Sequence, residues 1–255
     1  MYTEQQLIDL EQEERELTDE AIALMILLLA NAKSNLEREL RDFYHKYGKD
    51  GIVTYAEARK WIGDSDHRRR LTALLLYVNE NFDELRIELT PKFKEMLKDV
   101  IGKEIKFFDV ENENIADKPL NEPWGTDEKT WLDRLEDDIA IWCAYILFEV
   151  KQAFHKRSHI DTLIARLNKR FKSMESLLTT LGLSESTAVG SMSRRMIFQQ
   201  LGIGKYQFYT KADERTCEVC GSMHGLIFPI SAYEIGVTAS PLHPRCRCWE
   251  VPIVD

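Results

Sequence analysis

The stretch LIDLEQEERELTDEAIALMILLLANAKSNLERELRDFYHKYG, residues 7–48, decides the fold class. Its apolar residues return every three or four positions, which is the spacing of one face of an α-helix. It contains no proline, and its first glycine is Gly48 at the end. Thr3 followed by Gln6 has the pattern of a capping box, in which each residue satisfies a free amide at the helix start. The sequence therefore predicts one long helix, broken at most once, that starts near Thr3 and ends near Gly48.

The same periodicity returns along most of the remaining chain. Seven prolines and twelve glycines in 255 residues are too few for a fold of many short strands joined by turns. We expect a mainly α protein whose long helices form an extended helical body. The residues with N-cap signals are Thr54 (with Glu57), Thr90 (before Pro91), Thr126, Ser158 and Asp161. The further helical stretches are residues 65–89, 90–105, 127–157, 162–182 and 184–204.

The composition limits the location and the partners of the chain. With 34 basic and 43 acidic residues the formal net charge is −9, which disfavours bulk nucleic acid, so a DNA contact would need a local basic patch. The N-terminus has no basic segment followed by an apolar one, so we expect no secretory signal and a reducing compartment. The apolar run Ala21–Ala32 is about 12 residues long, short of the roughly 18 to 20 that cross a bilayer. We expect this run to be a buried or partner-facing helix.

Two short patterns in the helical part could suggest a functional site, but each has a structural explanation. The predicted turn at Asp50, followed in the sequence by Glu57, resembles part of a calcium-binding loop. The first and third ligand positions of that loop would be Lys46 and Gly48, where carboxylates are needed, so calcium binding is not expected. Cys143 lies in the middle of an apolar helical stretch, and we expect it to be a small core residue.

The character of the sequence changes at two places. Residues 106–126 lose the helical period and gather Asn, Asp, Pro and Gly, which predicts a connection with a short hairpin and an internal boundary. After Gly204 the segments KYQFYTK, GLIFPI and CRCWEVPIV are short, β-branched and aromatic, as in strands. A module of about 50 residues has little core of its own and needs a further constraint. We expect an N-terminal helical region (1–122), a central helical region (123–203) and a small C-terminal α+β module (204–255).

Four of the five cysteines lie in this C-terminal module, as Cys217-x-x-Cys220 and Cys246-x-Cys248. A Cys-x-x-Cys in a tight turn places two thiolates on one side of a loop, as half of a tetrahedral zinc site requires, and a second pair can complete the site. His243 is an alternative fourth ligand, and the sequence leaves the choice between His243 and Cys248 open. Four protein ligands leave no open coordination position, so the predicted Zn²⁺ is structural and no activated water is expected.

Alternative roles for the cysteines and histidines have weaker support in the sequence. The cysteines could form two disulfides or remain free thiols, whereas a thioredoxin-like redox site would need a surrounding βαβ pattern. A zinc deaminase needs a His-x-Glu motif, which the sequence lacks. A metal-dependent nuclease could use His224, His243 and Asp213, but two histidines and a carboxylate beside a zinc site are weak evidence. A DNA-binding zinc module is a further alternative, and its affinity would depend strongly on salt.

The segments YTKADERTCEVCGSMHGLIF (209–228) and SPLHPRCRCWEVPI (240–253) together resemble the C-terminal signature of the Mu F-like phage head-morphogenesis family. Members of this family are also called minor head or minor capsid proteins of tailed phages. The resemblance is specific over the C-terminal module, where two separated halves match in order and spacing, and looser over the helices before it. The residues that match are Asp213, Arg215, Thr216, Cys217, Cys220, Gly225, Pro241, His243, Pro244, Cys246, Arg247 and Cys248.

This resemblance implies a structural and assembly protein of a phage head, not an enzyme. It implies a virion protein present in few copies, assembled in the host cytoplasm and placed inside the head near the portal vertex, with a role in DNA packaging or ejection. The implied partners are the portal protein and also the scaffold or major capsid protein. Basic residues between 151 and 195 predict either a solvated face or a contact with packaged DNA or an acidic partner. The candidate contact residues are Arg166, Lys169, Arg170 and Lys172.

Overall fold

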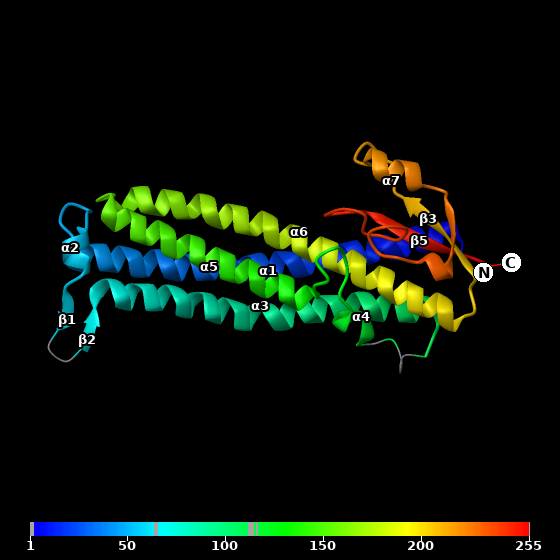
Figure 1. The fold of residues 1–255 in the computed structure, drawn as a ribbon, viewed down its shortest axis with the longest axis horizontal. Coiled ribbons are helices and arrows are strands. Elements are labelled where there is room, and N and C mark those ends of the chain that lie inside the picture. Colours follow the sequence, from blue (N-terminus) through cyan, green and yellow to red (C-terminus); the bar gives the residue numbers. More distant parts are fainter. Residues whose placement is uncertain (1–2, 64–65, 112–114, 116, 255) are drawn as a thin grey trace. The chain divides into compact units, whose positions relative to one another are not determined.

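The structure of the chain, a computed structural model, describes residues 3–63, 66–111, 115 and 117–254. In these ranges, four helices of 25 to 44 residues contain most of the chain, which confirms the predicted mainly α fold. Figure 1 shows them as long coiled ribbons. They are α1 (Glu4–Tyr47), α3 (Arg70–Phe108), α5 (Trp131–His155) and α6 (Ile160–Gln200).

The short elements lie between the long helices and in the C-terminal module. A short helix and an antiparallel hairpin follow α1. In the module, three antiparallel strands form a sheet with β3 in the middle, between β4 and β5, which confirms its predicted α+β character. The short elements are α2 (Tyr55–Ala58), β1 (Trp61–Gly63), β2 (Asp66–Arg69), α4 (Lys118–Asn121), β3 (Lys205–Thr210), α7 (Glu218–Met223), β4 (Ile227–Pro229), η1 (Ile230–Ala232) and β5 (Cys248–Ile253).

Two compact units make up the chain, and each of the four long helices contributes residues to both. The whole C-terminal module belongs to the first unit. The division into regions 1–122, 123–203 and 204–255 follows the sequence alone and stays a prediction. The first unit comprises Met1–Ala23, Pro91–Arg134 and Leu178–Asp255, and the second comprises Leu24–Thr90 and Leu135–Leu177.

The first helix begins and ends as the sequence predicts. The Thr3 N–H donates to Gln6 Oε1 at 2.9 Å, and the Gln6 N–H donates to Thr3 Oγ1 at 3.2 Å, so the capping box is present. Within the apolar run Ala21–Ala32, Met25 and Leu29 are completely buried. Among the described residues, no helix combines the length and the apolar character that a membrane span needs.

The helix α3 differs from the prediction at its start and in its middle. It begins at Arg70, because the hairpin β1–β2 replaces the first turn of the helix predicted there. It also continues through Pro91, so the prediction that Thr90 caps a new helix is wrong. The Thr90 hydroxyl instead donates to the Arg86 carbonyl at 2.8 Å. Buried apolar side chains occupy the same face before and after the proline, and their burial offsets the amide hydrogen bond that proline cannot make.

The helix α5 starts later than predicted. Thr130 caps it: its N–H donates to Asp133 Oδ2 at 2.9 Å, and the Asp133 N–H donates to Thr130 Oγ1 at 3.3 Å. The prediction that Thr126 is the cap is wrong, because the following Asp127 lies outside the helix and accepts a hydrogen bond from the Arg134 side chain. Both threonines have suitable side chains, and the structure uses the second.

The connection between α3 and α5 contains the short helix α4 and an isolated bridge between Trp124 and Lys129. These features replace the predicted hairpin in the described part of the connection. Residues 112–114 and 116 of the predicted hairpin region lie outside the described residues.

The helix α6 is continuous, where the sequence predicts two helices. His159 caps it, because its Nδ1 accepts the Asp161 N–H at 3.2 Å, and the predicted caps Ser158 and Asp161 are therefore wrong. Gly182, predicted to end a helix, lies inside α6, and a Cβ at this position would lie 2.8 Å from the Ile22 side chain. Glycine is needed here for the close approach of α1 and α6 in the first unit, not for chain termination.

Candidate metal centre

Cys217 and Cys220 are positioned by the start of α7. Cys217 is the N-cap of this six-residue helix, and its Sγ accepts the Cys220 N–H at 3.4 Å. This contact holds Cys217 in an extended backbone conformation and brings Cys220 to the same side of the loop one turn later. Cys217 is exposed and Cys220 is buried. The Cys-x-x-Cys segment therefore forms the pair of neighbouring thiols that its spacing predicts.

Cys246 and Cys248 come from the turn before β5 and from the first residue of β5. The Cys246 N–H donates to the His243 carbonyl at 3.1 Å, which closes a turn in which Arg245 has a φ of 60°. Cys248 pairs with Thr210 of the central strand β3. Both cysteines are buried. The structure places only Cys248 in the strand, and the turn before it brings Cys246 inward.

All five candidate ligands converge in two overlapping groups. Cys217, Cys220 and His243 form one group, and Cys220, Cys246 and Cys248 form the other, with ligand atoms within 4.8 Å of one another in each. His243 Nε2 lies 3.3 Å from Cys217 Sγ and 3.2 Å from Cys220 Sγ, and Cys220 Sγ lies 3.7 Å from Cys246 Sγ. In a tetrahedral zinc site, two sulfur ligands are about 3.8 Å apart, and a sulfur and a nitrogen about 3.5 Å. The spacings within each group of three therefore suit the ligands of a tetrahedral ion, and Cys220 is common to both groups.

The ring of His243 is oriented for metal ligation through Nε2. Its Nδ1 donates to the Pro244 carbonyl at 2.9 Å, which leaves the lone pair of Nε2 facing the thiols of Cys217 and Cys220. Burial lowers the pKa of His243, but the hydrogen bond to Pro244 and the nearby charges of Cys246 and Cys217 outweigh it and leave the pKa raised. A divalent cation at this position would oppose protonation and keep the ring neutral.

The thiols of the site shift one another's pKa values. Burial, followed by repulsion from Cys246, raises the pKa of Cys220 to about 12. The hydrogen bond with Cys248 lowers the pKa of Cys246 to about 6, and the same bond together with burial raises the pKa of Cys248 well above its usual range. The backbone N–H of Cys220 lowers the pKa of Cys217. These neighbouring thiols cannot all ionise without a compensating charge, which a bound divalent cation would supply.

The loop that carries the late cysteines is attached to α6. The Arg245 N–H donates to Ser184 Oγ at 3.1 Å, and its Nε donates to Thr180 Oγ1 at 2.8 Å. The Thr187 hydroxyl donates to the Cys246 carbonyl at 3.4 Å. These hydrogen bonds attach the loop that carries Cys246 to α6.

The residues considered for a nuclease have other partners. Asp213 accepts two hydrogen bonds from Arg247, at 2.5 and 2.6 Å, and this pairing lowers the pKa of Asp213. His224 Nδ1 accepts the Thr210 N–H at 3.2 Å. Among the residues that the structure describes, neither metal-capable group contains Asp213 or His224. In the described structure, the candidate metal group that contains His243 is completed by cysteines.

Two of the four candidate DNA-contact residues are paired within the protein. Arg166 Nε lies 3.3 Å, and Arg170 Nη2 2.8 Å, from the carboxylate of Glu149. Lys169 and Lys172 are exposed on α6. The charge available to an external anion in this stretch therefore comes mainly from the two lysines.

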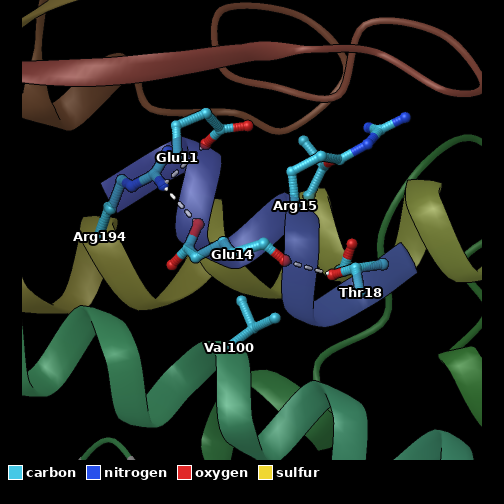
Figure 2. A pocket seen from close by; sticks show the side chains of 8 residues that line it. Glu11, Glu14, Arg15, Thr18, Val100 and Arg194 are labelled. Carbon is cyan, nitrogen blue, oxygen red and sulfur yellow. Dashed lines mark hydrogen bonds and ion pairs between the residues drawn. The ribbon is translucent and has the colours of Figure 1, made fainter. Parts of the chain in front are cut away.

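The sequence analysis missed a buried network around Arg194. Its Nη2 lies 3.0 Å from Glu14 and 3.3 Å from Glu11, its Nε 2.5 Å from Glu104, and its Nη1 3.8 Å from Glu250. Figure 2 shows Glu11 and Glu14 directed at the Arg194 guanidinium. One signal was present in the sequence, because Glu14 occupies a position in the apolar stripe of α1, where a charge is unusual.

Comparison with known proteins gives one match. Residues 144–251 match the family model described as Phage Mu protein F like protein. The matched range contains all of α6, the residues on α6 that hold the module, and all five candidate ligands. The match confirms the predicted resemblance for this part of the chain, and the family is one of phage head morphogenesis. No curated protein and no solved structure matches the chain.

Proposed function

We propose that this chain, which is Mu F-like over residues 144–251, is a minor head protein that takes part in the assembly of a tailed-phage head. The family match carries the proposal, because it covers the C-terminal module together with the helix that supports it. The hydrogen bonds that join Arg245 and the Cys246 carbonyl to α6 support a module that acts as one piece with this helix. The role is structural, with binding surfaces in place of a catalytic centre.

The second part of the proposal is a structural Zn²⁺ ion held by Cys217, Cys220, Cys246 and His243. His243 is favoured over Cys248 because its Nε2 faces two of the cysteine sulfurs directly, whereas Cys248 is hydrogen-bonded to Cys246. Four protein ligands close the coordination shell, so the ion would contribute folding free energy to the module and would activate no water.

We base the position of the chain inside the head, beside the portal protein, on its resemblance to the family. In this proposal the portal protein is the first partner, and the scaffold or major capsid protein is a further one. Lys169 and Lys172 are the exposed cations that we assign to packaged DNA or to an acidic portal face. Arg166 and Arg170 are less available, because Glu149 already pairs with both.

Co-expression of the chain with the portal, scaffold and major capsid proteins of its phage tests this function. We expect the chain to co-purify with the portal protein and to enter heads in few copies, as measured by quantitative immunoblotting of gradient-purified particles. Particles assembled without the portal protein are the control and should lack the chain. Complete heads that form without the chain would contradict a role in head assembly. If the chain enters particles equally well without the portal protein, its association with the portal protein is contradicted.

A further inference from the structure

A buried arginine surrounded by carboxyl groups lies in the first unit. The Arg194 cluster comprises Arg194 on α6, Glu11 and Glu14 on α1, Glu104 on α3 and Glu250 on β5. The Arg194 side chain is 4% exposed, and those of Glu104 and Glu250 are completely buried. Figure 2 shows the α1 side of this cluster beside α6 and α3. One cation therefore faces four acids that come from three other elements.

The other charged groups around the cluster offset these acids only in part, because Arg15 is attracted to Asp19 as well as to Glu11. The Arg15 guanidinium is directed away from Arg194 in Figure 2, and its Nε lies 3.8 Å from Asp19. Lys103 on α3 pairs with Glu13, at 2.5 Å, on another face of α1. The groups that donate to Glu250 are neutral. They are Ser191 Oγ at 3.0 Å, Tyr233 OH at 2.9 Å and the Ser240 N–H at 2.6 Å.

Glu14 and Glu104 are the two acids of the cluster with unsatisfied buried oxygens. Apart from the contact of Glu104 with Arg194, Glu14 Oε1 and both side-chain oxygens of Glu104 are buried and receive no hydrogen bond from a described donor. Burial raises the pKa of both carboxyl groups, so a proton on one of them is favoured. A Cβ at Gly190 would lie 3.6 Å from Glu104 and 3.7 Å from Glu14, so glycine leaves space beside the pair. Glu11 has the most exposed side chain of the four acids, at 21%, so it is the one that can exchange a proton with solvent.

We propose that the Arg194 cluster is a proton-binding site that attaches residues 4–23 of α1 to the rest of the first unit, and that Glu11 releases its proton as the pH rises through neutrality. Each proton lost adds a negative charge to a buried cluster in which acids already outnumber cations. Uncompensated buried charge is costly, so proton release weakens the packing of this part of α1. The proposal does not depend on a role in head assembly.

The direction of the pH effect follows from the pKa of Glu11. Burial, together with the charges of Glu104 and Glu250, raises this pKa to about 7 against the opposing effect of Arg194. In the unfolded chain the pKa of this carboxyl returns to about 4.5, so the folded chain binds more protons between these two values. The stabilisation is therefore complete below about pH 4.5 and is lost as the pH rises through about 7.

Replacing Glu11 with glutamine tests the proposal, because Glu11→Gln keeps the shape of the side chain and cannot ionise. Urea unfolding of the full-length, zinc-loaded chain is measured from pH 5 to 8. We expect the unfolding equilibrium constant of the wild-type chain to rise with pH by up to about tenfold per unit for the one proton concerned. In Glu11→Gln the unfolding equilibrium constant should no longer show this rise with pH. The amide protection of α1 should also no longer decrease towards pH 8.

Glu20→Gln is the matched control, because Glu20 is an exposed glutamate on the same part of α1. It should retain the pH dependence of the wild-type chain, including any contribution from the metal centre. Equal pH dependence in the wild-type chain and in Glu11→Gln would overturn the proposal. A carboxyl ¹³C titration of the wild-type chain gives a second readout that needs no variant of Glu11. A Glu11 midpoint near pH 7 supports the site, and a midpoint near the unshifted 4.5 overturns it.

Discussion

Replacing Arg194 with methionine is expected to lower the free energy of unfolding of the first unit by about 3–5 kcal/mol at pH 7, the usual cost of leaving buried charges without their partner. Methionine fills much of the space of the arginine stem, so the loss is mainly one of charge. The loss should be smaller at pH 5, because the carboxyl groups that lose Arg194 take up protons more easily. Urea unfolding followed by circular dichroism at both pH values, with zinc held constant, measures the effect.

Arg195→Met is the matched control for this experiment. Arg195 is the next residue of α6 and pairs with Glu122 at 2.6 Å, but both side chains keep contact with solvent. Partly exposed ion pairs of this kind contribute at most about 1 kcal/mol. If the two variants lose the same stability at pH 7, Arg194 does not neutralise a buried acidic cluster.

Replacing Cys220 with serine is expected to remove the metal and to expose residues 205–255 to amide hydrogen exchange. Cys220 belongs to both candidate ligand groups and is buried, so its loss leaves only two ligands in each group. Because metal binding contributes folding free energy to a module of this size, loss of the ion should loosen the sheet β3–β4–β5. The second unit contains none of the ligands and should keep its helices. Hydrogen exchange followed by mass spectrometry separates the two regions.

Cys143→Ser is the matched control, because Cys143 lies on α5 in the second unit and contacts Asn79 at 3.4 Å. This variant should keep the metal and the protection of the module. Unfolding of both units in Cys220→Ser would contradict a local role of the site. An unchanged module in the same variant would contradict the role of the metal in its stability.

Periodicity predicted the long helices because burial of one face is visible in the local sequence. The helix starts were less predictable, since several polar residues near each start can act as a cap. Thr126 and Thr130 are both suitable caps, and the structure uses Thr130 because α5 begins with Trp131, which is buried and stacks on Phe93 at 5.5 Å. That contact joins segments distant in the sequence, so no local pattern contains it. Pro91 shows the same limit, because long-range burial keeps α3 continuous across a residue that usually ends helices.

The candidate metal site was predictable, whereas the Arg194 cluster was not. The ligands of the metal site come as two short motifs whose spacing has a known chemical meaning. The members of the Arg194 cluster lie between residues 11 and 250 and share no motif, so only the fold brings them together. Only Glu14 could have been noticed in the local sequence, because it is a charged residue in the apolar stripe of α1. The exact ligand set also depends on side-chain directions, since the structure orients His243 by a hydrogen bond to Pro244 that spacing does not reveal.

The metal content of the purified, reduced chain tests most directly the claim that a metal ion holds the C-terminal module together. We expect about one zinc ion per chain, and removal of that ion by a chelator should abolish the amide protection of residues 205–255. A module that stays protected without metal, with Cys217, Cys220, Cys246 and Cys248 all titrating as free thiols, would contradict the claim.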